Sequence, residues 1–516
     1  MVALFGCGPT AEEREQAARG VVINTDGSAA DVNAKIASAA NGDTVKLPNG
    51  TFTWSTTVNL NKGITLQGGG IGTTIIKDAV QGSPLIKVTL AAGVVTRITG
   101  LEITDGGRST FYYGIINVLG STTNGAQYRM DGCKIINING IQELDTVIGV
   151  IDHNIFITDN GASPPWHIHG NKWADSDFGD GSWKEPVVWG SSKWLFIEDN
   201  TFSHTSGTQS VTDGDAGARW VIRYNTLNGA YEVDNHGTES TGRPRGCRAM
   251  DIYNNKFNSD GSNRFLGGSR SGGVLFHDNS IKGYWGALAA YGLNNFRSVH
   301  AYSPWGGADG TNPWDKNVTP AAFSGTAAAA SSGQSVTVSG ANWTTNQFAG
   351  YTLRRTSTNS SLPYTVINGN TSNRLDYVNN VIYGGETATT FAAGDGLEIR
   401  KVDIALDQPG AGAVNSLISG GWTPVVPSGW NQVVEPCYSW NNIDEKGNRI
   451  NFGPNFPSIR KGVHFFDETP MPGYTPYTYP HPLVSGSVPT PTPSVSPTPI
   501  PTAAPTATAT ATSTSS

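Results

Sequence analysis

Charge and cysteine are both scarce in this 516-residue chain. Asp, Glu, Lys and Arg together make up 15% of the residues, and the net charge is −7. The lysines and arginines form no dense cluster of the kind that tracks a phosphate backbone, so we expect no nucleic-acid partner. No run of about 18 apolar residues occurs, so we also expect no transmembrane span.

The four cysteines, Cys7, Cys133, Cys247 and Cys437, lie far apart and include no Cys-x-x-Cys pair. This spacing argues against a zinc site built on thiolates and assigns no disulfide. The segment that ends at Cys7 is similar to the end of a bacterial lipoprotein signal, although only six residues precede the cysteine. Residues 1–20 are therefore either a leader or lipoprotein-like segment or a chance likeness, and we expect an extracellular or cell-surface protein.

Glycine and proline, by contrast, are abundant, with 64 and 29 residues, and this balance favours β structure with many turns over a helical fold. A short helix is predicted at residues 31–39, before strand-like alternation begins at residues 42–48. A helix in this position would cap the otherwise open edge of the first strand.

The strongest pattern is an internal repeat, in which five eight-residue segments align on an asparagine. The anchors, Asn154, Asn200, Asn225, Asn255 and Asn279, are 46, 25, 30 and 24 residues apart, and 46 is twice 23. A period in the low to mid twenties with β-type alternation fits either a leucine-rich repeat or a parallel β-helix. The offsets that a leucine-rich repeat fills with Leu hold Ile, Phe, Met and Trp here, so we predict an all-β, right-handed parallel β-helix.

Coils of such a solenoid stack about 4.8 Å apart, so that equivalent residues form columns. Two columns are predicted to form the core: Ile151, Ile197, Ile222, Ile252 and Phe276 at offset −3 from the anchor, and Phe156, Phe202, Leu227, Phe257 and Ile281 at offset +2. The anchor asparagines are expected to bond the backbone at each bend. Alternation then predicts a solvent-facing column at offset −2, which holds Asp152, Glu198, Arg223, Tyr253 and His277.

The repeat also suggests the domain organisation. We assign residues 21–315 to the β-helix, 316–402 to a small β insert, and 403–485 to the return to the β-helix and its C-terminal cap. Residues 486–516 hold only small, apolar or hydroxylated residues and proline, without charge. This composition predicts a Pro/Thr-rich linker tail, which would space the protein from a cell surface or from another module.

The chain resembles the pectate-lyase-like superfamily of secreted right-handed parallel β-helix proteins. The likeness covers residues 21–315 and 404–484 and is carried by Gly42-Asp-Thr-Val45, Leu66-Gln-Gly-Gly-Gly70, the Asp-Asn-Thr-Phe type repeats and the closing Tyr477-Thr-Tyr-Pro-His-Pro-Leu483. It implies a polysaccharide substrate. Pectate lyases of this superfamily bind calcium through carboxylates and use an arginine as the base against a uronic acid.

Candidate catalytic residues follow from this resemblance and from the density of polar residues in the 213–251 segment. Arg243-Pro-Arg-Gly-Cys-Arg248 is similar to the Arg-and-Pro segment of pectate lyases, which suggests Arg245 or Arg248 as the base, although the spacing departs from Arg-x-Pro-x-x-Arg. A lyase must neutralise the substrate carboxylate, remove the adjacent proton and protonate the leaving oxygen. The residues predicted to do so are Arg245, Arg248, His236, Arg223 and Glu198.

Carbohydrate-binding and metal-binding residues are also predicted. Three tryptophans of the Trp-rich 166–194 segment and three neighbours of the polar segment are expected to contact an acidic glycan: Trp166, Trp183, Trp189, Arg219, Arg243 and Tyr253. Asp213-Gly-Asp215 is a candidate calcium corner, and its alternative reading is a turn. His167 and His169 share one strand face as a candidate metal pair, for which no third ligand is identifiable.

Three functions remain open. The first is a lyase that cleaves an acidic polysaccharide by β-elimination. The second is a glycoside hydrolase, which needs two carboxylates and for which Glu198 with Asp152 or Asp251 are candidates. The polygalacturonase segments Asn-Thr-Asp, Asp-Asp and Gly-His-Gly do not occur, which counts against that hydrolase family. The third is a non-catalytic surface adhesin or glycan-binding stalk.

Overall fold

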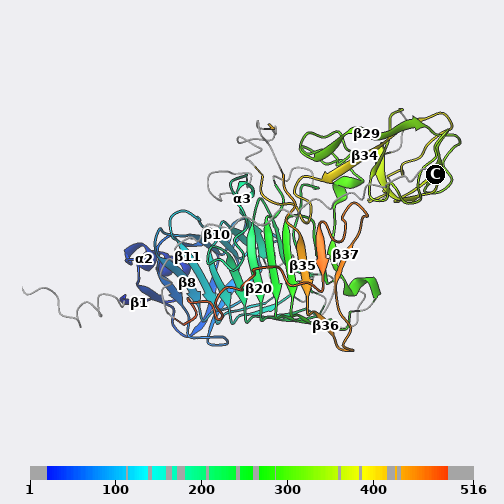
Figure 1. Cartoon of the computed structure of the whole chain (residues 1–516). Helices are drawn as coiled ribbons and strands as arrows, with labels where there is room; N and C mark the ends of the chain where they lie inside the picture. Colours follow the sequence, from blue (N-terminus) through cyan, green and yellow to red (C-terminus); the bar gives the residue numbers. More distant parts are fainter. Residues whose placement is uncertain are drawn as a thin grey trace, which may run out of the picture.

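The structure is a computed structural model. It describes residues 20–111, 114–136, 142–158, 166–170, 180–204, 209–229, 231–239, 245–259, 266–284, 286–357, 362–382, 386–414, 425–426 and 432–485. Three long parallel sheets stack coil upon coil into a parallel β-helix (Figure 1), which confirms the predicted fold class. The predicted lipoprotein-like segment with Cys7 and the linker tail lie outside the described residues.

We name the three sheets A, B and C. Sheet A contains β1 (Val22–Asn24), β2 (Thr44–Lys46), β5 (Thr65–Gln67), β8 (Val95–Thr99), β11 (Gln127–Asp131), β14 (Gly149–Asp152), β17 (Leu195–Glu198), β20 (Arg219–Arg223), β23 (Ala249–Tyr253), β26 (Gly273–His277), β35 (Cys437–Trp440) and β38 (Phe465–Asp467). Sheet B contains β3 (Gly50–Trp54), β6 (Thr74–Asp78), β9 (Glu102–Asp105), β12 (Lys134–Ile136), β15 (Ile155–Ile157), β18 (Thr201–Ser203), β21 (Thr226–Asn228), β24 (Lys256–Asn258), β27 (Ser280–Lys282) and β36 (Ile443–Asp444). Sheet C contains β4 (Val58–Leu60), β7 (Ile86–Thr89), β10 (Ile116–Leu119), β13 (Glu143–Asp145), β16 (Trp166–His169), β19 (Gln209–Asp215), β22 (Tyr231–Asp234), β25 (Gly267–Ser269), β28 (Tyr291–Leu293) and β37 (Phe452–Pro454).

The predicted columns lie inside the solenoid. In sheet A, Ile151 pairs with Ile197, Ile197 with Ile222, and the column continues to Ile252 and Phe276. In sheet B the column of Phe156, Phe202, Leu227, Phe257 and Ile281 is equally in register. All ten side chains are buried in one continuous apolar core, so the repeat period sets the register of the sheets.

The anchor asparagines form the expected ladder at the bend between sheets A and B. The side-chain oxygen of each accepts hydrogen bonds from the backbone and side-chain amides of the preceding anchor, for example from Asn154 to Asn200 at 2.9 and 3.0 Å. The ladder continues through Asn225, Asn255 and Asn279. It ends on Asn442, beyond the insert, so the chain resumes the same solenoid after the insert.

A helix covers the N-terminal end of the core, as predicted. Helix α2 (Ala29–Ser38) begins where the Ser28 hydroxyl accepts a hydrogen bond from the backbone amide of Asp31. Its Val32 and Ile36 are buried against the first coils. The helix therefore closes the end of the stack over an apolar surface that would otherwise face water.

The small β insert is a separate antiparallel sheet with its own core (Figure 1). Its strands are β29 (Lys316–Thr326), β30 (Ser335–Thr337), β31 (Thr352–Arg355), β32 (Tyr364–Asn370), β33 (Arg374–Tyr377) and β34 (Gly396–Ile404). The remaining described helical segments are short: α3 (Asp180–Lys184), η1 (Gly286–Ala289) and η2 (Phe296–Ser298). Within the described ranges, no helix has both the length and the apolar character that a membrane crossing requires.

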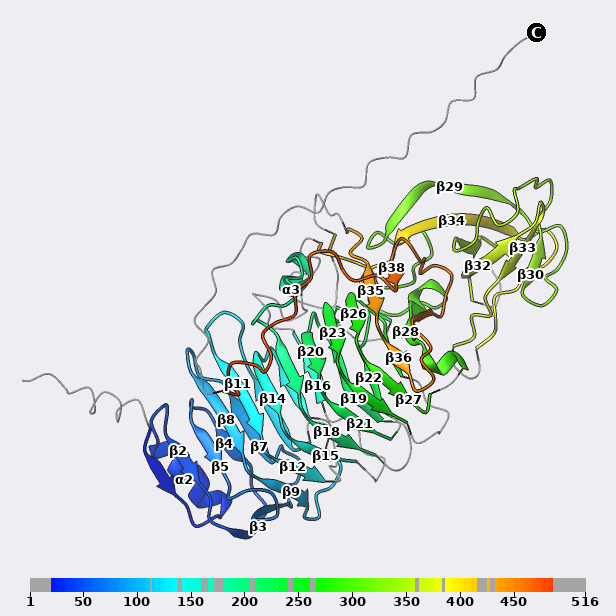
Figure 2. The ribbon, with the colours of Figure 1, turned by 60° about the horizontal axis from the view of Figure 1, so that its bottom comes forward.

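The last described segment, residues 474–484, runs back along the stack over the outer face of sheet A (Figure 2). We name it the C-terminal strap. It contacts Asp251 through Tyr474, Glu198 through His481 and Arg129 through Leu483. The prediction that the offset −2 column of sheet A faces solvent is therefore wrong, because the strap covers it: Asp152, Glu198, Arg223, Tyr253 and His277 are all buried.

Candidate functional site on sheet C

The predicted site residues lie in three separate places. Glu198, Arg223 and Tyr253 lie under the strap on sheet A; Arg219, Arg245, Arg248 and Trp183 lie around α3; and Asp213, Asp215 and His236 lie on the outer side of sheet C. Arg243 lies outside the described residues. The single groove expected from the sequence is thus divided, and only the third group is described with a pocket beside it.

Under the strap, Glu198 and Arg223 form the close pair that the register predicted, with 2.6 Å between Oε2 and Nη2, but both side chains are fully buried. Arg223 also donates to the Tyr253 hydroxyl and to the carbonyl oxygens of Tyr477 and Thr478, each at 2.7 to 2.8 Å. Burial raises the pKa of Glu198, while Arg223 limits the rise. These contacts fasten the strap and leave Glu198 and Arg223 no surface for a substrate.

Around α3, the arginines tie distant segments together. Arg245 forms a two-pronged ion pair with Asp407 at 2.6 and 2.8 Å and contacts Asp180 at 3.0 Å. The guanidinium carbons of Arg245 and Arg248 each lie 5.0 Å from the centre of the Trp183 ring. Arg245 and Arg248 have no exposed side-chain surface, so the structure does not present them to a polysaccharide.

Arg219 and the tryptophans are also buried away from solvent. Arg219 donates to the carbonyl oxygen of Ser182 at 2.6 Å, and burial lowers its pKa to about 9, with Arg248 adding to the effect. Trp166 points into the solenoid core, edge-on to Phe156, because alternation along β16 turns it inward together with Ile168. Trp189 is half-buried against Trp194. Trp166 and Trp183 therefore cannot line a glycan groove.

The outer face of sheet C carries a dense group of titratable side chains. Glu143 pairs with His167 and His167 with Asp213, while Asp145, His169 and Asp215 form the next row. Between these rows Leu144 and Ile168 point into the core, so the charged side chains point outward. The group stacks because the coils that contribute it differ in length by only a few residues.

His169 lies between two carboxylates. Its Nε2 is 2.6 Å from Glu143 Oε2, and its Nδ1 is 2.5 Å from Asp215 Oδ1. Burial opposes protonation, but Asp215 and Glu143 outweigh it and raise the pKa of His169 well above its ordinary value. The second imidazole, His167, places Nδ1 3.1 Å from Glu143 Oε1.

One coil further, His236 links Asp213 and Arg270. His236 Nε2 is 3.0 Å from Asp213 Oδ2, and His236 Nδ1 is 2.6 Å from Arg270 Nη1. Burial lowers the pKa of His236, but Asp213 and Glu239 outweigh it and raise it to about 9. The pKa of Asp213 falls to about 2, because His236 outweighs the burial of this carboxyl.

A pocket of about 230 Å³ adjoins Arg270, which lines it together with Asp234, Asn294 and Phe296. Its floor is a column of glycines, Gly268, Gly292 and Gly453, at the positions that follow Asp234 on successive coils. A Cβ atom on Gly268 would come within 3.2 Å of the Asn294 amide and the Gly292 carbonyl. The glycines therefore keep the space open beside the charged group.

Asp213 and Asp215, the residues predicted to bind calcium, each contact an imidazole: Asp213 that of His236 and Asp215 that of His169. Sequence reasoning missed Glu143, Asp234 and Arg270, which complete the site. Counting one repeat period of 24 residues back from His167 leads to Glu143 and would have found it.

Comparison with known proteins adds no relative: no protein-family model and no curated protein matches this chain. The geometry of sheet C is therefore the basis of the functional argument.

Proposed function

We propose that the protein is an extracellular, polysaccharide-active member of the pectate-lyase-like proteins that cleaves an acidic glycan by β-elimination at the sheet C pocket. The observation that carries this proposal is the chain of contacts from Asp213 through His236 to Arg270, with Arg270 lining the pocket. It places a cation and a basic ring nitrogen side by side at an open space, as elimination from a uronic acid requires.

Each residue has a defined task in this reaction. Arg270 binds the uronate carboxylate and draws charge from the adjacent carbon. His236 Nδ1, which now accepts a hydrogen bond from Arg270, is released when Arg270 turns to the substrate and removes the proton from that carbon. The bond to the leaving oxygen breaks as the carbon–carbon double bond forms, and water protonates the leaving oxygen. Asp213 holds the Nε2 proton of His236 and fixes the tautomer.

The test is product analysis on polygalacturonate and alginate. We expect ultraviolet absorbance from an unsaturated uronide, together with new reducing ends. His236→Gln and Arg270→Met should each lower kcat/KM by at least about 100-fold. Arg374→Met, which changes an exposed arginine of the insert, is the matched control and should leave the rate unchanged. A wild-type protein that binds these glycans but forms no product would be an adhesin and would exclude cleavage.

Hydrolysis is the second candidate, favoured by two neighbouring carboxyls with opposite pKa shifts. The pKa of Asp213 falls to about 2, whereas burial, together with Asp213, raises that of Asp234 despite Arg270. Such a divergence is typical of the base and acid of a glycosidase. Reducing ends without the unsaturated product, abolished by Asp234→Asn, would assign hydrolysis instead of elimination.

A further inference from the structure

We propose that Glu143, His167 and His169 bind a divalent transition-metal ion on the outer face of sheet C. The three residues come from β13 and β16, which are adjacent strands of successive coils. Their potential ligand atoms all lie within 4.8 Å of one another. This inference does not depend on the cleavage reaction, because none of the three residues takes part in it.

The distances suit a metal after a small adjustment. Glu143 Oε2 lies 2.6 Å from His169 Nε2, and Glu143 Oε1 lies 3.1 Å from His167 Nδ1. Zinc bonds of about 2.0 to 2.1 Å in a tetrahedron separate their ligand atoms by about 3.3 Å. The glutamate needs to move by less than about 1 Å, so the site is close to its liganded geometry.

An independent observation is the contact behind His169. Asp215 Oδ1 lies 2.5 Å from Nδ1, the ring nitrogen that does not face Glu143. A carboxylate on the far nitrogen of a histidine is the arrangement that orients metal-bound imidazoles in proteins and increases their basicity. Asp215 therefore holds the imidazole with Nε2 directed at the proposed ion.

The burial pattern fits a preformed site with access from one side. The side chains of Glu143 and His167 are 4% and 2% exposed, whereas that of His169 is 20% exposed. The β-ladder holds all three backbones, so little conformational entropy is lost when a metal binds. An ion can enter past His169.

The ligand chemistry selects the metal. Two imidazoles and one carboxylate suit Zn²⁺ and similar transition metals, whereas Ca²⁺ takes six to eight oxygen ligands. The site therefore favours a transition metal over the calcium expected at Asp213 and Asp215. Three protein ligands also leave a coordination position for a water molecule or a substrate oxygen.

The experiment uses chelator-treated full-length protein titrated with Zn²⁺ by calorimetry and with Co²⁺ by visible absorption. We expect one high-affinity equivalent and the intense visible bands of four-coordinate Co²⁺. His167→Gln, which leaves the contacts from Glu143 to His169 and from His169 to Asp215 in place, should weaken binding by at least about 100-fold. Asp215→Asn should weaken it by about 10- to 100-fold.

His153→Gln is the matched control, since this histidine is 57% exposed on sheet A, and it should bind like the wild type. Circular dichroism and melting in chelator identify any variant that fails to fold. Such a failure transfers the decision to the wild-type Co²⁺ spectrum, where only weak six-coordinate bands would refute the site. Unchanged Zn²⁺ affinity in folded His167→Gln would refute it as well, whether or not the protein cleaves a glycan.

Discussion

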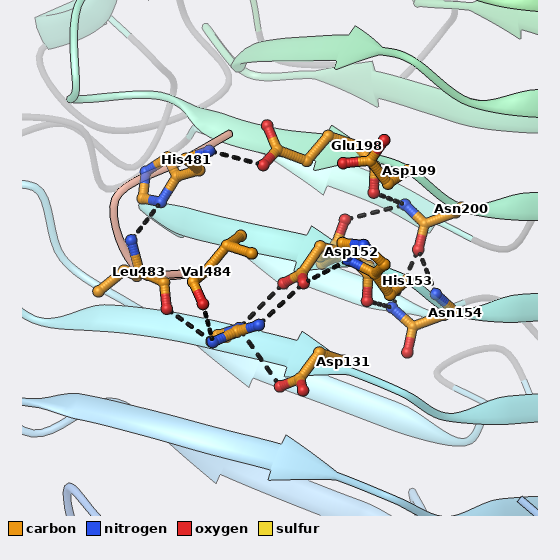
Figure 3. Close-up of polar contacts among 12 residues, drawn as sticks. Asp131, Asp152, His153, Asn154, Glu198, Asp199, Asn200, His481, Leu483 and Val484 are labelled. Carbon is orange, nitrogen blue, oxygen red and sulfur yellow. Dashed lines mark hydrogen bonds and ion pairs between the residues drawn. The ribbon is translucent and has the colours of Figure 1, made fainter. Parts of the chain in front are cut away.

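The backbone amide of His481 donates a hydrogen bond of 2.7 Å to the carboxylate of Glu198, a residue 283 positions earlier in the chain (Figure 3). The same carboxylate pairs with Arg223, which binds two strap carbonyls. The strap and the outer face of sheet A thus share one buried polar network. A column of charges that alternation would direct into water instead holds the C-terminal segment on the solenoid.

We therefore expect Arg223→Met to destabilise the protein by about 3 to 5 kcal/mol, because it leaves the Glu198 carboxylate buried without its cation. Denaturant unfolding, followed by circular dichroism, measures this loss. Arg374→Met breaks an exposed ion pair and should cost less than about 1 kcal/mol. Equal losses in the two variants would contradict the strap network.

The second prediction concerns pH. Burial, helped by Arg223 and Arg129, lowers the pKa of His481 to about 3, whereas an unfolded histidine has a pKa near 6.5. Between these values the unfolded chain binds more protons, so folding stability is lost as the pH falls from about 6.5 toward 3. This group alone should cost about 2 kcal/mol at pH 5.

His481→Asn isolates that contribution. The asparagine oxygen can replace Nδ1 as the acceptor for the backbone amide of Leu483, which lies 3.2 Å from it (Figure 3). The stability difference between wild type and variant, measured by denaturant unfolding from pH 7 to pH 4, should shift toward the variant on acidification. A difference that stays constant over this range would show that His481 does not titrate with folding.

The third prediction tests the asparagine ladder. Asn225→Leu removes one rung, so that the amide of Asn200 and the carbonyl of Ile197 lose hydrogen-bond partners inside the protein. Because each buried group left without a partner costs about 1 to 3 kcal/mol, we expect a loss of at least about 2 kcal/mol. Asn379→Leu, on the surface of the insert, should change stability little, and thermal melting compares the two.

The sequence was sufficient for the fold because the solenoid is a local repeat. Ile151 and Ile197 could be aligned by counting, and their contact follows from the period alone. The burial of Glu198 could not be found in this way, because the strap that covers it lies 283 residues away and belongs to no repeat. Long-range contacts of this kind decide which outward columns remain outward.

The same distinction applies to the site. Trp166 was expected to bind sugar from its composition-rich segment, but the phase of β16 turns it into the core and turns His167 and His169 outward. A loop of uncertain length separates β16 from the anchor Asn154, so the phase could not be carried across it. The periodic coils are predictable, whereas the faces of strands that follow long loops are not.

The pH profile of catalysis tests the role of His236. A base must be unprotonated, and the pKa of His236 is raised to about 9 because Asp213 and Glu239 outweigh burial. If His236 removes the proton, kcat/KM should rise with pH up to about 9 and then level off. Asp213→Asn removes the main stabilising charge, so the rise should move to lower pH while the plateau falls. A profile that decreases through pH 9, or one that Asp213→Asn leaves in place, would assign proton abstraction to another group.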